Sequence, residues 1–209
     1  MPKISVIVVD YNNLEYTKRC LDSLYATSYK DKEIIVVDNG SGSNARSFYY
    51  GEQCAGRIIF FDYIINVGLA RAQNWGGNFA QGEYLFFLNN DTLVKPDIFE
   101  RLLESSYDVV GCRMFDYKGK KELDSALSVD RFGYPAGKTG AMFYPDGAIF
   151  IKKRVFQEIG GFDEKLFLYG EDRDLCWRVF LAGYTVGYNR SAIFYHRSFS
   201  VSDTCYFRR

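Results

Sequence analysis

The segment ISVIVVDYNN, residues 4–13, decides the fold of this chain. Its first six residues are almost all apolar and β-branched, which predicts a strand buried on both faces. The polar residues that follow Val9 indicate that this strand delivers a loop at its carboxyl end. Strands buried on both faces are typical of a parallel sheet that is covered by helices.

The segments that follow alternate between helix and strand patterns. Apolar residues recur at helical spacing over 14–25, and a second buried strand is expected at 33–37. Further strands are expected at 57–61, 83–88, 108–111, 147–151 and 192–195, and further helices at 68–80, after Pro96, at 154–159 and at 171–182. This alternation predicts an α/β fold with a Rossmann-like, mostly parallel central sheet flanked by helices. A small antiparallel region is expected in the C-terminal half.

Composition limits the class of protein. With 209 residues, 47% of them hydrophobic, the chain should form one domain with one core. Lysine plus arginine and aspartate plus glutamate both number 26, so net charge gives no indication of a nucleic-acid partner. We expect this domain to consist of two halves, 1–112 and 113–209.

The ends and the cysteines of the chain bear on location. The apolar run after Lys3 is too short for a signal peptide or a membrane span. Five cysteines without close pairing suggest neither a disulfide framework nor a zinc site, so a reducing, cytoplasmic location is expected. The aromatic and basic residues 202–209 leave two alternatives open, a frayed tail or peripheral contact with the inner face of the membrane.

Polar residues follow three of the expected strands, at 10–13, 38–41 and 89–92. In open parallel sheets, ligands bind beyond the carboxyl ends of the strands, so the chemistry is expected there. Asp91 and its neighbouring amides could hold Mg²⁺ or Mn²⁺, which a nucleotide diphosphate requires. The alternative is that this segment makes a turn and caps the next helix.

Two more segments contain residues that could act in a reaction. The segment FLYGEDRDLCWR, residues 167–178, places three carboxylates at the start of a helix, where one of them could act as a base. The alternative is a solvated acidic first turn. His196, the only histidine, is either a metal ligand or a hydrogen-bonded structural residue. Arg71 follows Gly68 at the start of a helix, and it could reach a pyrophosphate or lie on the surface.

These segments together resemble the inverting family 2 glycosyltransferases of the A-type (GT-A) fold, and especially their rhamnosyltransferase-like branch. The resemblance runs along most of the chain. It is carried by residues 6–12, 36–41, 66–76, 88–92, 147–151, 160–164 and 167–178.

The resemblance implies a site for a nucleotide diphosphate sugar, UDP- or dTDP-linked. Tyr11 would stack on the base, Asp38 would hydrogen-bond it, and Arg71 would approach the diphosphate. The residues implied in donor binding are Asp10, Tyr11, Asn12, Asp38, Asn39, Gly68, Arg71 and Asn90.

The resemblance also implies the metal and the base. Asp91 stands at the last aspartate of the Asp-x-Asp motif, and His196 would complete the shell of a Mg²⁺ or Mn²⁺ ion. Asn89 replaces the first aspartate, which is a departure from the family pattern. Asp172 would be the catalytic base, and Glu171 would position the acceptor or tune its neighbour.

The function implied is a metal-dependent hexosyltransferase of polysaccharide biosynthesis. It would transfer the sugar to a hydroxyl on a glycan or a lipid-linked saccharide by direct displacement with inversion. Two alternatives remain. The first is a sugar-phosphate nucleotidyltransferase, which needs a glycine-rich phosphate loop that residues 10–13 lack. The second is an inactive relative that binds a glycan or a nucleotide, and the departure at Asn89 keeps this alternative open. The irregular stretch 115–144 is expected to shape the acceptor site.

Overall fold

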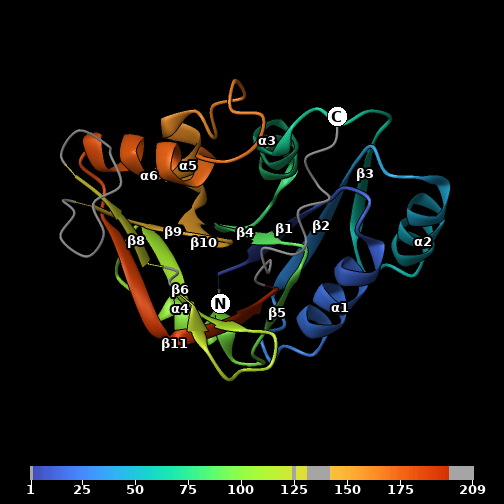
Figure 1. Cartoon of the computed structure of the whole chain (residues 1–209), viewed down its shortest axis with the longest axis horizontal. Helices are drawn as coiled ribbons and strands as arrows, with labels where there is room; N and C mark the ends of the chain where they lie inside the picture. The colour runs from blue at the N-terminus through green and yellow to red at the C-terminus, as the bar shows by residue number, and fades with distance from the viewer. Residues whose placement is uncertain (1, 124–125, 131–141, 198–209) are drawn as a thin grey trace.

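The computed structural model describes residues 2–123, 126–130 and 142–197 of the chain. Their centre is a mixed, mostly parallel sheet with helices on both faces (Figure 1). Its first part has the order β3-β2-β1-β4, in which neighbouring strands run parallel. These strands are β1 (Ile4–Asp10), β2 (Lys32–Asn39), β3 (Ile59–Tyr63) and β4 (Tyr84–Asn89).

The second part of the sheet contains the reversed strands. β10 (Ala148–Lys152) lies antiparallel between β4 and β6 (Val109–Asp116). β11 (Val186–His196) runs parallel to β6, and β5 (Thr92–Val94) pairs antiparallel with the end of β11. β7 (Glu122–Leu123) pairs with β6, while β8 (Ala126–Val129) and β9 (Met142–Pro145) form a separate antiparallel pair. The predicted α/β sheet and its antiparallel region are confirmed.

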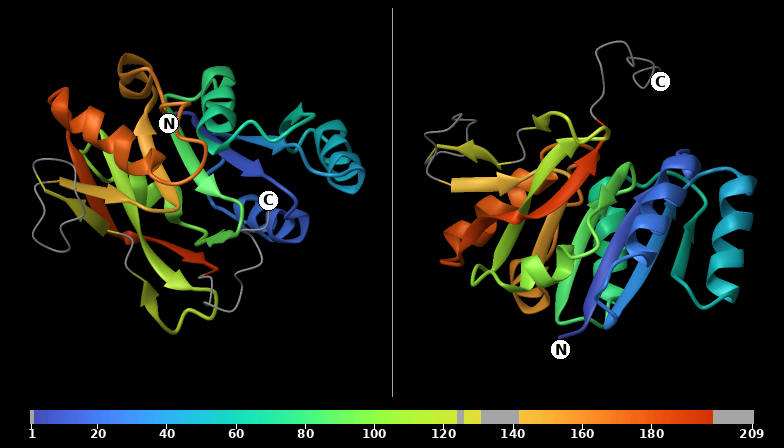
Figure 2. Two further views of the ribbon diagram at one scale, coloured as in Figure 1. Left: turned by 45° about the horizontal axis from the view of Figure 1, so that its top comes forward. Right: turned by 90° about the horizontal axis from the view of Figure 1, so that it is seen from below.

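Helices cover the sheet in two groups, which Figure 2 shows from two further directions. One face carries α1 (Leu14–Tyr25), α2 (Ser43–Cys54) and α4 (Ile98–Leu103). The other face carries α3 (Leu69–Phe79), α5 (Lys153–Ile159) and α6 (Glu171–Leu181). None of the helices in the described residues has the length and apolar character that crossing a membrane requires.

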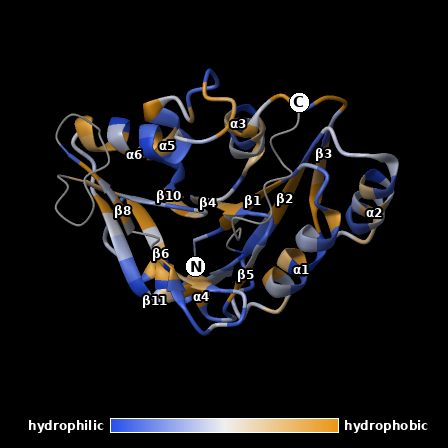
Figure 3. Cartoon of the chain, in the orientation of Figure 1, coloured by the Kyte–Doolittle hydropathy of each residue, from blue (hydrophilic) through white to orange (hydrophobic). Residues whose placement is uncertain are grey.

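Successive side chains of a strand point to opposite faces of the sheet, and this alternation produces two hydrophobic cores. Val6 and Val8 face the core beneath α1, while Ile7 between them faces the core beneath α3. Hydrophobic residues accordingly gather on the central strands in Figure 3. Each fully buried valine or isoleucine contributes roughly 1.5–3 kcal/mol, so this sheet is a rigid base for the loops at its carboxyl edge.

Some element boundaries differ from those that the sequence pattern predicts. The pattern does not indicate α2, because that helix buries only Ala45, Tyr49 and Glu52. β11 begins six residues before 192, since polar residues between Asn189 and Ile193 form an irregularity within the strand. β6 extends to Asp116, into the stretch expected to be irregular. The remaining acceptor-loop residues 124–125 and 131–141, and the tail at 202–209, lie outside the described residues.

Candidate active site

The carboxyl ends of β1, β2 and β4 lie side by side. Asp10 is level with Asp38 in the β1–β2 ladder, and Val9 is level with Asn89 in the β1–β4 ladder. The three polar segments predicted to follow these strands therefore meet at one edge of the sheet.

Asp10 organises this edge. Its carboxylate is fully buried and accepts hydrogen bonds on both oxygens. The donors are Asn13 N (3.1 Å), Thr17 Oγ1 (3.0 Å), Asn90 Nδ2 (2.8 Å), Tyr49 Oη (2.8 Å) and Ser41 Oγ (3.5 Å). Asp10 thus joins the loop after β1 to α1, α2 and the turn after β4. The Asn90 side chain is held by the same network, because it also bonds Thr17 Oγ1 at 2.9 Å.

Asp38 lies next to Asp10 but keeps an acceptor free. Its Oδ1 accepts the Ser41 N–H at 2.9 Å, whereas its buried Oδ2 has no hydrogen-bond partner among the described residues. Arg46 Nε lies 3.9 Å from Oδ2 and is closer to Asp62, at 3.1 Å. Burial raises the pKa of Asp38, and the charges of Asp10 and Asp62 add to this effect. An unsatisfied buried acceptor is costly, so this oxygen is suited to a ligand N–H.

The loop after β1 lines an open cavity. Asn12 has a left-handed backbone (φ 54°), and its N–H bonds Ser41 Oγ at 2.8 Å. Tyr11 before it is 45% exposed, which leaves its ring available for stacking. A cavity of about 460 Å³ is lined by residues 12–15 and 41–45, at the starts of α1 and α2.

Asn39 and Gly68 fix the loop before α3. Asn39 Oδ1 accepts the Val67 N–H, and Asn66 Oδ1 accepts both Asn39 Nδ2 and the Gly68 N–H, each at 2.9 Å. Gly68 has φ 90°, and a Cβ there would lie 3.0 Å from Phe167. Only glycine fits this position without strain. The segment before α6 therefore packs directly on the start of α3.

Arg71 forms an ion pair at the surface of the molecule. Its Nε lies 2.8 Å from Glu164 Oε2, and both side chains are exposed. Exposed ion pairs contribute roughly 0–1 kcal/mol, so this pair holds the arginine only weakly. The structure gives no contact between Arg71 and the Asp91 region.

Asp91 and His196 meet at the end of β4. His196 is level with Thr92 in the β11–β5 ladder, and its Nε2 lies 3.2 Å from Asp91 Oδ1. Burial lowers the pKa of His196, but the bond to Asp91 and the charges of Asp91 and Asp146 outweigh this and raise it. The surroundings of His196 therefore favour positive charge.

The Asp91–His196 pair fits a divalent cation that is shared with a phosphate. Within the described ranges, no three histidine, cysteine, aspartate or glutamate side chains converge closely enough to hold a metal by themselves. Mg²⁺ is usually bound by one or two carboxylates together with substrate phosphates, and imidazole is a further ligand for transition metals. Asp91 and His196 could therefore hold Mg²⁺ or Mn²⁺ only in part, with a diphosphate supplying other oxygens.

Glu171 and Asp172 begin α6 on the other side of the site. Gly170 before them has φ 92°, which turns the chain into the helix. Enclosure by protein raises the pKa of both carboxyls, and for Asp172 the charges of Glu171 and Asp146 raise it further. The Gly147 N–H bonds Asp172 and acts in the opposite direction. Asp172 is only partly buried, so a substrate hydroxyl can reach it.

Asp146 is a site residue that the sequence analysis did not identify. It lies in the turn between β9 and β10, and its charge acts on both Asp91 and Asp172. Burial raises its pKa, His196 lowers it, and Asp91 raises it. The signal was available, because Asp146 flanks a buried apolar strand just as Asp91 does.

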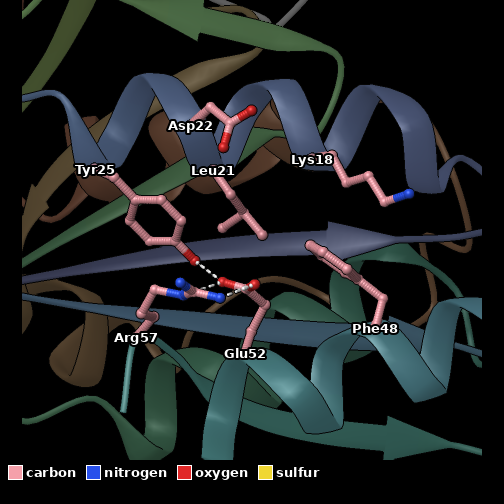
Figure 4. A pocket seen from close by; sticks show the side chains of 7 residues that line it. All are labelled: Lys18, Leu21, Asp22, Tyr25, Phe48, Glu52 and Arg57. Carbon is pink, nitrogen blue, oxygen red and sulfur yellow. Dashed lines mark hydrogen bonds and ion pairs between the residues drawn. The ribbon is translucent and has the colours of Figure 1, made fainter. Parts of the chain in front are cut away.

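A second cavity, of about 250 Å³, lies between α1 and α2. Figure 4 shows that Tyr25 and Arg57 both bond Glu52 across its floor. Tyr25 and Glu52 lie in the last turns of α1 and α2, and Arg57 follows α2, whereas the site lies at the N-terminal ends of these helices. This cavity is therefore separate from the site.

Comparison with known sequences identifies related proteins. The model of the family described as "Glycosyl transferase family 2" matches residues 5–160. The chain is 28% identical to an uncharacterized glycosyltransferase of Rickettsia typhi over 97% of this chain and 66% of that protein. It is 32% identical to the glycosyltransferase GlyA of Streptococcus pneumoniae serotype 4 over 68% of this chain and 18% of that protein. The chain thus spans less than two thirds of the length of these relatives.

Solved structures share the architecture. Residues 1–349 of S. aureus TarS in complex with UDP-GlcNAc superpose with a TM-score of 0.74 at 20% identity, covering 98% of this chain and 61% of that one. GalNAc-T7 with UDP, GalNAc and Mn²⁺ gives a TM-score of 0.76 at 16% identity, covering 95% of this chain and 44% of that one. At these identities the similarity shows a common fold of the GT-A type.

Proposed function

The chain belongs to glycosyl transferase family 2, and on that premise we propose that it is an inverting glycosyltransferase. It moves a sugar from a nucleotide diphosphate sugar to a hydroxyl acceptor. One observation carries the proposal. The Asp91–His196 pair and the partly buried Asp172 lie on two sides of the Asp146–Gly147 turn, which brings the proposed cation ligands and the proposed base to one site.

The donor side of the proposal rests on the first loop and Asp38. Tyr11 stacks on the nucleotide base, and the free Oδ2 of Asp38 accepts a base N–H. Asn12 and Asn39 shape the nucleoside pocket, while Asp10, Gly68 and Asn90 hold its loops. The proposed donor is a UDP- or dTDP-linked sugar. We assign residues 1–112 to this donor half and 113–209 to the acceptor half.

Asp91 and His196 would hold the divalent cation. A bound Mg²⁺ or Mn²⁺ neutralises the charge that grows on the departing diphosphate. TarS and GalNAc-T7 were solved with UDP-GlcNAc and with UDP and Mn²⁺, respectively, which supports a nucleotide and a cation in this fold. Arg71 can reach the diphosphate only after leaving Glu164.

Asp172 is the catalytic base. Its carboxylate takes the proton of the acceptor hydroxyl as the oxygen attacks the anomeric carbon. The bond from that carbon to the diphosphate oxygen breaks, and the nucleoside diphosphate leaves with the electron pair. Attack from the side opposite the leaving group inverts the configuration. Glu171 orients the acceptor, which we infer to be a glycan or a lipid-linked saccharide.

A binding protein without activity is the second candidate, because Asn89 departs from the family pattern. The position of Asp172 favours the enzyme, because a partly exposed carboxylate on the other side of the turn from the Asp91–His196 pair is where a general base is needed. Family membership also argues against a nucleotidyltransferase.

Nucleotide binding tests the proposal first. Thermal unfolding is followed with UDP, dTDP, GDP and ADP, each with and without Mn²⁺, because a ligand that binds only the folded chain raises its melting temperature. We expect a Mn²⁺-dependent rise with one pyrimidine diphosphate. The matching nucleotide sugars are then incubated with saccharide acceptors, and release of the diphosphate is measured. No rise with any of the four nucleotides refutes the donor assignment, and binding without release favours the binder.

A further inference from the structure

The turn before β10 brings Asp146 to the end of β4. β10 runs antiparallel to β4 with Ala148 level with Leu88, so Gly147 comes opposite Asn89, and Asp146 is the next residue of the turn. The Asn89 N–H bonds the Gly147 carbonyl at 3.0 Å, which extends the ladder to this point. The register of two strands therefore fixes Asp146 beside the segment that carries Asp91.

The same turn lies against the proposed cation ligands. A Cβ on Gly147 would lie 3.4 Å from Asn89 Nδ2 and 3.6 Å from His196 Cδ2. Asn89 offers an amide where the family motif has a carboxylate, so the end of β4 presents one acid fewer at this place. Asp146, in the turn before β10, supplies a carboxylate next to this place.

The charges around the turn are unbalanced. Asp146 interacts electrostatically with Asp91, His196, Glu171 and Asp172. Four of these five groups are acids, and His196 alone can carry positive charge. Like charges in partly buried surroundings repel strongly, and a bound divalent cation is the largest local charge that can compensate them.

We propose that Asp146 is a positioning residue of the cation site, supplying from the turn before β10 the second carboxylate that Asn89 does not provide on β4. It acts through cation-bound water or His196, because no third acidic or histidine side chain in the described residues converges with Asp91 and His196. Carboxylates that act in this indirect way orient the ligands and strengthen the hold on the metal. This inference rests on the proposed function.

The role of Asp146 is tested by measuring Mn²⁺ binding to variants in which the carboxylate is removed from position 146 or placed at position 89. Free Mn²⁺ is measured by electron paramagnetic resonance in titrations of the parent, Asp146→Asn, Asn89→Asp and the double variant, with UDP at a fixed concentration and a protein-free blank. We expect Asp146→Asn to weaken Mn²⁺ binding roughly tenfold or more, the usual effect of losing such a partner. The double variant restores the affinity to within about twofold of the parent, because the carboxylate returns at the family position. Asp146→Glu, which keeps the charge, stays near the parent.

Asp172→Asn is the matched control, because it removes a carboxylate that faces Asp146 and not Asp91 or His196. Its Mn²⁺ affinity stays within about twofold of the parent, and unchanged melting temperatures exclude loss of the fold. If Asp146→Asn binds Mn²⁺ like the parent, or if Asn89→Asp fails to rescue it, the role of Asp146 is refuted while the proposed function stands. If the parent itself binds UDP but no Mn²⁺, the cation assignment and this inference are both refuted.

Discussion

Two aspartates at the same edge of the sheet have opposite surroundings. Asp10, on the donor side, is fully buried, and hydrogen-bond donors reach both of its oxygens. Asp172, on the acceptor side, faces two other carboxylates and accepts the Gly147 N–H. The first arrangement satisfies both carboxylate oxygens and fixes loops, whereas the second raises the affinity for a proton. In the proposed function, one edge of the sheet thus provides both a rigid donor pocket and a base.

The largest effect should come from the base. Asp172→Asn keeps the shape of the side chain but removes its ability to take a proton, so kcat should fall by about 10³. Nucleotide affinity and melting temperature should stay near those of the parent, because asparagine keeps the size and polarity of this side chain, which is partly exposed at the start of α6. Steady-state kinetics and nucleotide titration measure the two effects. If Asp172→Asn retains more than a tenth of kcat, the base is elsewhere.

Asp10 should show the reverse pattern, a loss of stability. Asp10→Ala leaves buried donors such as Tyr49 and Thr17 without their acceptor, which should lower the free energy of unfolding by about 2–4 kcal/mol. Urea denaturation measures this change. Asp62→Ala is the matched control at the end of β3, where the ion pair with Arg46 is partly exposed and its loss should cost under about 1 kcal/mol. Equal losses in the two variants would falsify the structural role of Asp10.

The pH dependence of kcat/KM sharpens the comparison. The base acts when it is deprotonated, so activity is lost as pH falls through the raised pKa of the Glu171–Asp172 pair. The fall of kcat/KM on the acid side of the profile should therefore begin at a higher pH than the pKa of an ordinary aspartate. Below that point kcat/KM should decrease about tenfold per pH unit. The groups facing Asp172 are Glu171, Asp146, Tyr144 and Cys176. A limb at the ordinary pKa of an aspartate contradicts the assignment.

The smallest effect should come from the exposed ring at the donor pocket. Tyr11→Ala removes a stacking surface, which should weaken nucleotide diphosphate binding about five- to tenfold. Tyr11→Phe keeps the ring and should bind like the parent. Isothermal titration with the preferred nucleotide separates the variants, and equal affinity for all three proteins removes Tyr11 from the pocket.

Much of the fold follows from the sequence because the strands are buried on both faces. Continuous apolar runs such as 4–9 and 84–88 leave no other place for them than the centre of a sheet. Their polar ends then locate the donor side of the site, since parallel strands end at a common edge. Asp38 and Asp91 could be selected in this way, and Asp172 from the acidic start of a helix; their roles remain predictions.

The features of the fold and the site that could not be predicted depend on contacts between residues that are distant in sequence. α2 covers the sheet with few buried residues, so its pattern is weak. The place of Asp146 depends on the antiparallel register between β10 and β4, which no local pattern encodes. Arg71 is paired with Glu164, and the sequence gives no sign of that ion pair.

Gly147 joins the donor side to the acceptor side through its backbone alone. Its carbonyl accepts the Asn89 N–H, and its N–H bonds Asp172. Neither bond involves a side chain of the stretch 115–144. If the proposed function holds, residues of that stretch can be exchanged to change the acceptor while the alignment of the proposed base is kept, provided that Gly147 and Asp172 are retained.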